Sequence, residues 1–580
     1  MDLQQLKKLK MRKNKYIYVL TLLVLSYACN EDNTLPEIVE EDTETVAFEN
    51  NGDVDFSNYV AIGASFTAGF TDNALFINAQ ENSFPNIMAG IFSDIANGGN
   101  FTQPLMNDNI GGMLFGGALD PNGGFLPRLY FNGSGPAVLN ATPTTEATSK
   151  LSGTFNNMGV PGAKSYHLVA DGYGSLAAMS LGLANPYFVR FSSGETTSVL
   201  TDAITQQPTF FSLIDGGGND VLGYALAGGG ILNGQQAIDQ TGNFDPSTYG
   251  TWDITDPNVF ASVFSNIVTA LTSSGAKGVI SNVPYITSLA HFTTVPYNPL
   301  DPTEVDDDGE LTDTATGLVE QVPTLNTVFG AVNQVFEAVG ETNRIVEFTT
   351  TETNPVVIID ENLADLSATI TTALANNPEF PAFVQQFGLP TEATPLVAGL
   401  LGTFYGQIRP ATADDLLVLP SSGIIGTVNT DSVAYLMSQG LSQELAGQFS
   451  VEGLTKPLDD NWVLTPEEQE TIKTATDAYN ETIAAIASAN ENVVLVDFNG
   501  ILTEAATTGL AFDTYTMTTD LVTGGLISLD GIHLTSRGYA LMANKILEAI
   551  DNGFDTNFTE ATNGLAKADD YPTNYSSTLE

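Results

Sequence analysis

Asp530 and His533 could form a general-base pair. They lie three residues apart in the segment LDGIHLTSRGYALMANKI. At this spacing a carboxylate can reach back to an imidazole within one turn or tight loop. It can then fix the ring's tautomer and favour the imidazolium that forms when the ring accepts a proton. The same spacing is common by chance, and taken alone a surface turn before the last helix explains it better.

Ser65 is a candidate nucleophile for such a base. It lies in YVAIGASFTAGF, residues 59–70, where an apolar run ends in small residues. A serine hydroxyl is weakly nucleophilic unless a neighbouring base takes its proton, and the chain has only three histidines. A buried strand that ends in a tight turn explains the local sequence equally well, so the rest of the chain has to supply the partners.

Two further segments could stabilise an oxyanion. In FFSLIDGGGNDVLGYA, residues 210–225, an apolar run ends in three glycines and Asn219. The side-chain amide of Asn219 can donate a hydrogen bond to a developing negative charge. In FNNMGVPGAKS, residues 155–165, Gly162 could present an unobstructed backbone N–H. Taken singly, each segment also fits an ordinary glycine-containing turn.

Short apolar runs alternate with amphipathic helices around these segments. The clearest helix is predicted from Pro257 to Ser274, with Asp256 as its N-cap, and a second begins with the capping box Thr465–Glu468 and runs to about Asn490. Buried strands are expected at residues 59–62, 209–214, 278–284 and 493–496. This alternation favours a parallel sheet with helices on both faces, and such sheets bind ligands beyond the carboxyl ends of their strands.

The length and composition allow one large domain with an insertion. The chain has 580 residues, of which 43% are hydrophobic. Residues 55–555 are predicted to form the α/β domain, interrupted by an insertion at about 285–464 that breaks the strand–helix rhythm. Residues 556–580 are expected to form a loose tail. The apolar residues of the insertion would line a substrate pocket if the insertion covers Ser65, and they would otherwise form extra core. These residues are Phe380, Phe383, Phe387, Leu389, Leu396, Leu400, Leu401, Phe404 and Tyr405.

Three other features receive structural interpretations. His291 follows the strand expected at 278–284 and is a candidate pocket residue, although a plain loop histidine is the preferred interpretation. His167 is expected on a helix surface or in packing. The acidic loop around Asp306 and Asp308 has part of the rhythm of a calcium loop but lacks the leading Asp and the closing Glu, so the sequence does not establish a calcium site.

The N-terminus has the features of an export signal. Residues 1–28 contain six basic residues followed by the short apolar run 16–28, which is below the roughly 20 residues needed to span a bilayer. Cys29, the only cysteine, follows directly and resembles the processing site of bacterial lipoproteins. The sequence therefore predicts a signal peptide at 1–28 and a lipidated Cys29. Residues 29–54 would form an acidic tether, and the protein would be anchored in the outer membrane, with the cell surface as one option.

The charge balance excludes one class of partner. The chain has 18 basic and 68 acidic residues, and its formal net charge is −50. A surface of this sign repels phosphate backbones and anionic head groups, so nucleic-acid binding is not expected.

Taken together and in this order, the four segments resemble the blocks of the SGNH subgroup of GDSL esterases and lipases. The matching residues are GASFTAG with Ser65, NMGVPGA with Gly162, GGND with Asn219, and DGIH with Asp530 and His533. The resemblance implies a three-layer α/β/α sandwich of flavodoxin-like type and acyl transfer without a metal or cofactor. Ser65 would attack an ester with His533 as base and Asp530 as its orienting partner. The Ser65 N–H, the Gly162 N–H and the Asn219 side chain would hold the oxyanion.

One departure from the family leaves rival interpretations open. The first block of the family usually reads Gly-Asp-Ser, whereas this chain has Ala64 in the middle position. A lipid or other carboxylic ester is the leading substrate, and removal of acetyl groups from a polysaccharide is the near rival. A non-catalytic surface binding lipoprotein on a degenerate fold is the third possibility. Ala64 and the large insertion favour it slightly, whereas the presence of all five site residues argues against it.

Overall fold

A five-stranded parallel sheet organises the protein in the computed structural model, which describes residues 45–49, 53–120, 123–306 and 308–579. The strand order is β15-β10-β7-β1-β6, and all four neighbouring pairs are parallel. If the five strands are numbered 1 to 5 in chain order and the sheet is read from its β6 edge, the order is 2-1-3-4-5, which is that of flavodoxin-like folds. The predicted fold class is confirmed. The strands are β1 (Tyr59–Gly63), β6 (Asn157–Gly159), β7 (Phe210–Ile214), β10 (Lys277–Ser281) and β15 (Val493–Val496).

The central strands follow from their apolar runs. Every residue of β1 and β7 is buried, as expected for strands covered on both faces. The strands predicted at 59–62, 209–214, 278–284 and 493–496 are confirmed, with small shifts of their ends. The edge strand β6 was not predicted, because its three residues carry no readable apolar period.

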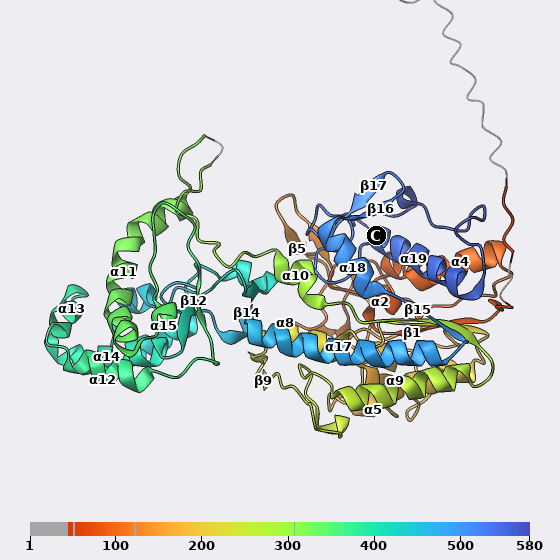
Figure 1. Cartoon of the computed structure of the whole chain (residues 1–580), viewed down its shortest axis with the longest axis horizontal. Helices are drawn as coiled ribbons and strands as arrows, with labels where there is room; N and C mark the ends of the chain where they lie inside the picture. The colour runs from red at the N-terminus through yellow and green to blue at the C-terminus, as the bar shows by residue number, and fades with distance from the viewer. Residues whose placement is uncertain (1–44, 50–52, 121–122, 307, 580) are drawn as a thin grey trace, which may run out of the picture. The chain divides into compact units, whose positions relative to one another are not determined.

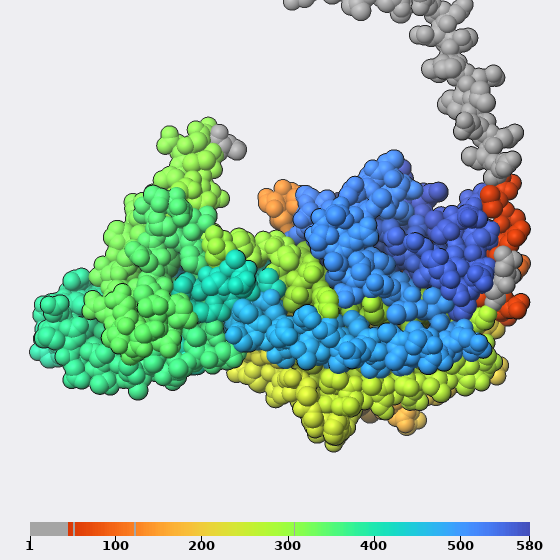
Figure 2. Space-filling model, viewed as in Figure 1, coloured from red at the N-terminus to blue at the C-terminus, as the bar shows by residue number. Residues whose placement is uncertain are grey.

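Helices cover both faces of the sheet, and Figure 1 shows the two layers. On one face α4 (Phe84–Ile95) contacts α19 (Ser536–Phe554), and on the other α9 (Pro257–Thr272) contacts α17 (Pro466–Ala489). In Figure 2, α17 lies along the surface beside α9. The two predicted helices begin as expected. Asp256 accepts hydrogen bonds from the backbone N–H groups of Asn258 and Val259, and the Thr465–Glu468 capping box is formed.

Shorter elements complete the α/β domain. The helices are α2 (Ser65–Ala68), α3 (Ile77–Glu81), α5 (Leu176–Met179), α6 (Pro186–Val189), α7 (Val199–Thr205), α8 (Asn219–Leu226) and α18 (Phe498–Thr507). The antiparallel pairs are β2 (Leu114–Phe115) with β3 (Ala118–Leu119), β4 (Leu129–Phe131) with β5 (Pro136–Val138), β8 (Ile231–Leu232) with β9 (Gln235–Gln236), and β16 (Leu510–Phe512) with β17 (Tyr515–Met517).

The chain between β10 and α17 builds apolar cores of its own. Its helices are α10 (Ala290–Thr293), α11 (Asp313–Val339), α12 (Ser367–Asn376), α13 (Phe380–Gln386), α14 (Thr394–Tyr405), α15 (Thr430–Ser438) and α16 (Gln443–Gln448). Its strands pair as β11 (Val357–Ile359) with β12 (Ile408–Pro410) and β13 (Leu416–Leu417) with β14 (Val463–Leu464). Phe380, Leu401 and Tyr405 are buried in a cluster with residues of α11 and α12.

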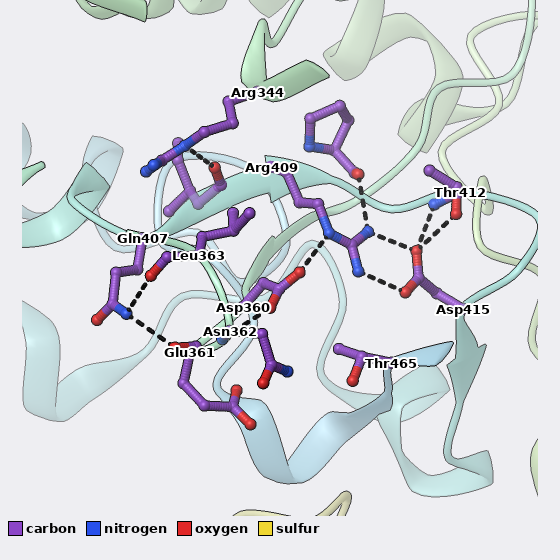
Figure 3. Close-up of polar contacts among 12 residues, drawn as sticks. Arg344, Asp360, Glu361, Asn362, Leu363, Gln407, Arg409, Thr412, Asp415 and Thr465 are labelled. Atoms are coloured by element: carbon purple, nitrogen blue, oxygen red, sulfur yellow. Dashed lines mark hydrogen bonds and ion pairs between the residues drawn. The ribbon is translucent and has the colours of Figure 1, made fainter. Parts of the chain in front are cut away.

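A buried ion-pair network lies within this insertion. Arg409 Nε donates to Asp360 Oδ2 at 2.6 Å, and its Nη1 and Nη2 donate to the two Asp415 oxygens at 2.6 and 2.7 Å (Figure 3). The side chain of Asp415 is fully buried. Such a bidentate pair fixes the relative orientation of the segments that carry it.

The C-terminal segment is packed rather than loose, so the expectation for residues 556–580 is wrong. Phe558 is fully buried, and its ring centroid lies 5.5 Å from those of Phe56 and Phe92. Tyr575 is also buried, and its hydroxyl accepts a hydrogen bond from Asn82 Nδ2 at 3.0 Å. These aromatic anchors carry no periodic pattern, which explains why the sequence did not reveal them.

The predicted N-terminal features lie largely outside the described residues. The signal peptide at 1–28 and Cys29 belong to residues 1–44, which the structure does not describe. The predicted tether ends inside the folded core, because Val54 is only 4% exposed. Among the described helices, none has both the length and the apolar character required to cross a membrane.

Candidate active site

Ser65 is the first residue of the short helix α2, directly after β1. The turn that delivers it is tight, because a Cβ added to Gly63 would lie 2.0 Å from the Ile214 carbonyl oxygen. The Thr67 hydroxyl donates to the same carbonyl at 3.0 Å. The candidate nucleophile is therefore fixed against the end of β7, at the point between β1 and β7 where the strand order reverses. Ligands bind there in folds of this order.

His533 and Asp530 form a buried pair. His533 Nδ1 lies 2.9 Å from Asp530 Oδ2, and Asp530 Oδ1 accepts from the backbone N–H groups of Ile532 and His533 at 2.9 and 2.8 Å. Burial alone would raise the pKa of Asp530. The charge of His533 and these hydrogen bonds outweigh burial and hold that pKa below its ordinary value. Asp530 is thus ionised at neutral pH and can orient the ring.

A turn that follows α2 clamps the loop carrying this pair. The Asn73 N–H donates to Asp530 Oδ2 at 2.9 Å, and Asp72 Oδ1 accepts from the Leu529 N–H at 3.1 Å. Asp72 and Asn73 both have positive φ, at 51° and 60°, a conformation that Asp and Asn tolerate better than most residues. Burial raises the pKa of Asp72 to about 7. This clamp was not predicted from the sequence, although Asp-Asn is a recognisable turn signal.

The other two histidines have packing roles. The His291 backbone N–H donates to the Gly531 carbonyl at 2.9 Å, and its ring Nδ1 lies 3.4 Å from the Asp530 carbonyl oxygen. His291 therefore supports the Asp530–His533 loop through contacts with its backbone carbonyl groups. His167 stacks on Tyr173 with centroids 4.5 Å apart, and burial lowers its pKa to about 3. A ring that remains neutral in this way fits the packing interpretation.

The segments that carry Gly162 and Asn219 are fastened to each other. Asn219 opens α8, and its Nδ2 donates to the Ala163 carbonyl at 2.9 Å. Next to it, Asp220 accepts from the Ser165 N–H and hydroxyl at 2.8 and 2.7 Å. Gly162 has a φ of +79° and is exposed, and a Cβ there would meet nothing within 4 Å. The Gly162 turn and the Asn219 amide are consequently held in a fixed relation.

Ser65 and His533 share neighbours without a direct bond. Within the described part of the chain no hydrogen bond joins the Ser65 hydroxyl to the His533 ring. The ring of Phe66, next to Ser65, has its centroid 5.4 Å from that of His533, and the Phe70 centroid lies at 4.7 Å. Hydrogen bonds between a nucleophile and its base are often long before substrate binds.

Asp215 supplies a carboxylate beside Ser65 that the sequence did not predict. It follows β7 with a φ of 58° and is half-buried, and its Oδ2 accepts from the Phe66 N–H at 3.4 Å. Burial raises its pKa to about 7, while the Phe66 hydrogen bond, the charge of His533 and the Ser65 side chain act in the opposite direction. Ala64 itself is fully buried. The acidic group next to the nucleophile thus comes from the neighbouring strand instead of position 64.

A largely apolar pocket opens beside Ser65 and Asn219. The side chains that line it come mainly from α18, α19 and the ends of the strands, and include Leu222, Phe498, Ile501, Leu502, Leu541 and Met542. None of the nine apolar residues between Phe380 and Tyr405 that the sequence offered as a pocket lining is among them. All of them except Leu396, which is exposed, lie in and around the insertion's own clusters, which is the extra-core alternative.

Comparison with known proteins gives one match. The family model described as GDSL-like Lipase/Acylhydrolase matches residues 419–546. The matched segment contains α17, β15, α18 and the loop with Asp530 and His533, whereas Ser65, Gly162 and Asn219 precede it. No curated protein and no solved structure matches the chain.

Proposed function

Since the chain belongs to the SGNH/GDSL family of lipases and acylhydrolases, whose general activity is ester hydrolysis, we propose that it is a serine esterase. In this proposal Ser65 is the nucleophile, His533 the general base and Asp530 its orienting partner. The observation that carries the proposal is the hydrogen-bonded His533–Asp530 pair beside the Ser65 turn, at the edge of an apolar pocket.

The proposed reaction has two steps. The Ser65 oxygen attacks the ester carbonyl carbon while His533 Nε2 takes the hydroxyl proton, which it then delivers to the departing alcohol. Water, deprotonated by the same nitrogen, next attacks the acyl-enzyme. The acid is released, and Ser65 recovers its proton. The N–H groups of Ser65 and Gly162 and the amide of Asn219 would donate to the oxyanion that forms in each step.

Asp530 supports this assignment electrostatically. Its ionised oxygens favour the Nδ1–H tautomer of His533, which leaves Nε2 free to accept a proton. They also stabilise the imidazolium once the proton has moved. The clamp by Asn73 keeps the carboxylate in place during both steps.

The pocket favours an apolar acyl chain as the group that is transferred. Its lining is mostly aliphatic and aromatic side chains, which gain free energy when they exclude water from a hydrocarbon. A sugar would bring hydroxyl groups that need polar partners, and burying them without such partners is costly. We therefore favour a lipid or another long-chain ester over an acetylated polysaccharide.

The proposed location is the outer membrane, through a lipid on Cys29. The basic and apolar residues of segment 1–28 support this proposal, as does the position of the cysteine directly after them. An acidic chain of net charge −50 would not be held at an anionic membrane by charge, so a covalent lipid is the more suitable anchor.

A substrate series tests the proposed function. The purified protein is assayed with p-nitrophenyl esters from acetate to laurate and with acetylated xylan, alongside Ser65→Ala. We expect kcat/KM to rise with acyl length and Ser65→Ala to abolish turnover. Preference for acetate and acetylated xylan would move the assignment to a polysaccharide esterase. Absence of turnover on every ester would favour the non-catalytic binding lipoprotein.

A further inference from the structure

Three carboxylates gather away from the candidate active site. Glu361 follows β11, Asp460 opens the short 3₁₀ helix Asp460–Trp462, and Glu468 lies in the first turn of α17. One oxygen of each lies within 4.8 Å of the other two. Carboxylates this close repel one another when ionised, so the arrangement needs either a retained proton, which the raised pKa values of Asp460 and Glu468 indicate, or a compensating cation.

Two oxygens of this acidic cluster lack a hydrogen-bond partner although they are buried. Glu468 Oε2 accepts from the Thr465 N–H and hydroxyl at 2.7 and 2.9 Å, which completes the capping box. Its other oxygen, Oε1, has no hydrogen-bond partner in the described part of the chain, and Glu468 is only 4% exposed. Asp460 Oδ1 is in the same situation. Buried carboxylate oxygens in this state are costly unless a proton or a bound cation satisfies them.

Glycines bring the backbone close to the carboxylates of Glu468 and Asp460. A Cβ on Gly229 would lie 2.2 Å from Glu468 Oε1, and a Cβ on Gly230 would lie 2.3 Å from Asp460 Oδ2. Both glycines follow α8, whose C-terminal end carries the negative pole of the helix dipole. The surroundings therefore add to the attraction for a cation.

The positive side chain nearby is already engaged. Arg409 binds Asp360 and Asp415, and the Glu361 side chain points away from it (Figure 3). Asp360 acts on Asp460 as a further like charge, and the cluster raises the pKa of Tyr224 on α8, where burial is the larger cause. The titratable groups that face the cluster are thus acidic or phenolic.

We propose that Glu361, Asp460 and Glu468 bind a divalent cation, specifically Ca²⁺, independently of the catalytic proposal. An all-oxygen, carboxylate-rich ligand set selects hard cations over metals that prefer nitrogen or sulfur. Ca²⁺ tolerates ligands from separate segments, and water or carbonyl oxygens complete its six to eight ligands, whereas Mg²⁺ demands a nearly ideal octahedron. The ion would fasten the insertion, through Glu361, to the start of α17.

Calcium titration of the chelator-treated, purified protein tests this site. Calorimetry should detect one Ca²⁺ site per chain, and thermal unfolding should shift upward by several degrees in calcium relative to EGTA, since an ion that binds only the folded state stabilises it. Glu361→Gln is the main variant, because Glu361 is exposed and we expect its replacement to leave folding intact. Glu468→Gln is the second, because Gln can still form the capping box.

The control is Asp308→Asn in the exposed acidic loop, which removes one negative charge elsewhere. We expect at least a tenfold loss of calcium affinity in Glu361→Gln and Glu468→Gln and none in Asp308→Asn. The proposal is wrong if the wild-type protein binds no Ca²⁺ at millimolar concentration. It is equally wrong if Glu361→Gln retains the site or if Asp308→Asn loses it, because binding would then come from the acidic surface or that loop.

Discussion

Replacing Asp530 by Asn tests whether the carboxylate orients the His533 ring, and a matched control variant separates this role from a general loss of stability. The carboxylate accepts two hydrogen bonds on each oxygen, and three of the donors are backbone N–H groups. An amide presents only one accepting oxygen. Wherever its nitrogen points, it meets at least one N–H that it cannot satisfy. The least costly arrangement places the nitrogen toward Asn73 and His533 Nδ1.

That arrangement forces the wrong tautomer. His533 Nδ1 would have to accept, so the ring proton would move to Nε2, the nitrogen that must take the Ser65 proton. We expect kcat to fall by about 10⁴, the loss typical of this change in a Ser-His-Asp triad. The unsatisfied N–H and the lost charge-assisted bonds should lower the free energy of unfolding by roughly 2–4 kcal/mol.

The pH dependence of this stability loss has a definite sign. Because the pKa of Asp530 is lower in the folded protein, its contribution is present above the unfolded pKa near 4 and disappears as the pH falls below it. The difference in unfolding free energy between wild type and Asp530→Asn should therefore shrink in acid. Urea unfolding at pH 7 and pH 3 measures it.

Asp256→Asn is the matched control for Asp530→Asn. Asp256 also accepts three backbone N–H bonds, at 2.7, 2.8 and 3.1 Å, but it caps α9 and makes no contact with His533. We expect this variant to retain wild-type kcat. If Asp530→Asn keeps more than a tenth of the wild-type kcat, or if Asp256→Asn loses as much, the orienting role of Asp530 is refuted.

Two further predictions concern the nucleophile's surroundings. Asp215→Asn should gain stability relative to wild type as the pH rises from 4 to 8, by up to roughly 4 kcal/mol, because a folded pKa of about 7 makes ionisation of Asp215 costly in the wild-type protein. Urea unfolding at the two pH values tests this prediction, and a difference in unfolding free energy that stays constant between them would contradict it. Leu502→Trp should shift the ester preference toward shorter acyl chains, because the larger side chain fills the pocket. Leu181→Trp is the control, since this side chain is 72% exposed and lies outside the pocket, and it should leave the preference unchanged. If Leu502→Trp and wild type have identical chain-length profiles, this pocket does not hold the acyl group.

The features that the sequence predicted correctly depend on local patterns. The β1 and β7 strands were visible as apolar runs, and α9 and α17 as helical periods with recognisable caps. The His533–Asp530 contact was predictable because three residues separate the partners. The flavodoxin-like order came from the family resemblance.

The features that the sequence left out depend on contacts between distant residues. Asn73 and Asp530 are 457 positions apart, and no local pattern signals that one clamps the other. Asp215 reads as part of a glycine-rich turn, and only the pairing of β1 with β7 brings it to Phe66. The sequence left open whether the apolar residues of the insertion line a substrate pocket or form extra core, since apolar composition does not say which cavity a segment faces.

Covalent labelling tests whether Ser65 is the nucleophile and His533 its base. The protein is incubated with a fluorophosphonate probe, which reacts with activated serine nucleophiles, and the modified peptide is identified by mass spectrometry. We expect one label on Ser65, no label in Ser65→Ala, and strongly slowed labelling in His533→Ala. Labelling at another serine, or equal labelling of the wild-type and His533→Ala proteins, would contradict this assignment.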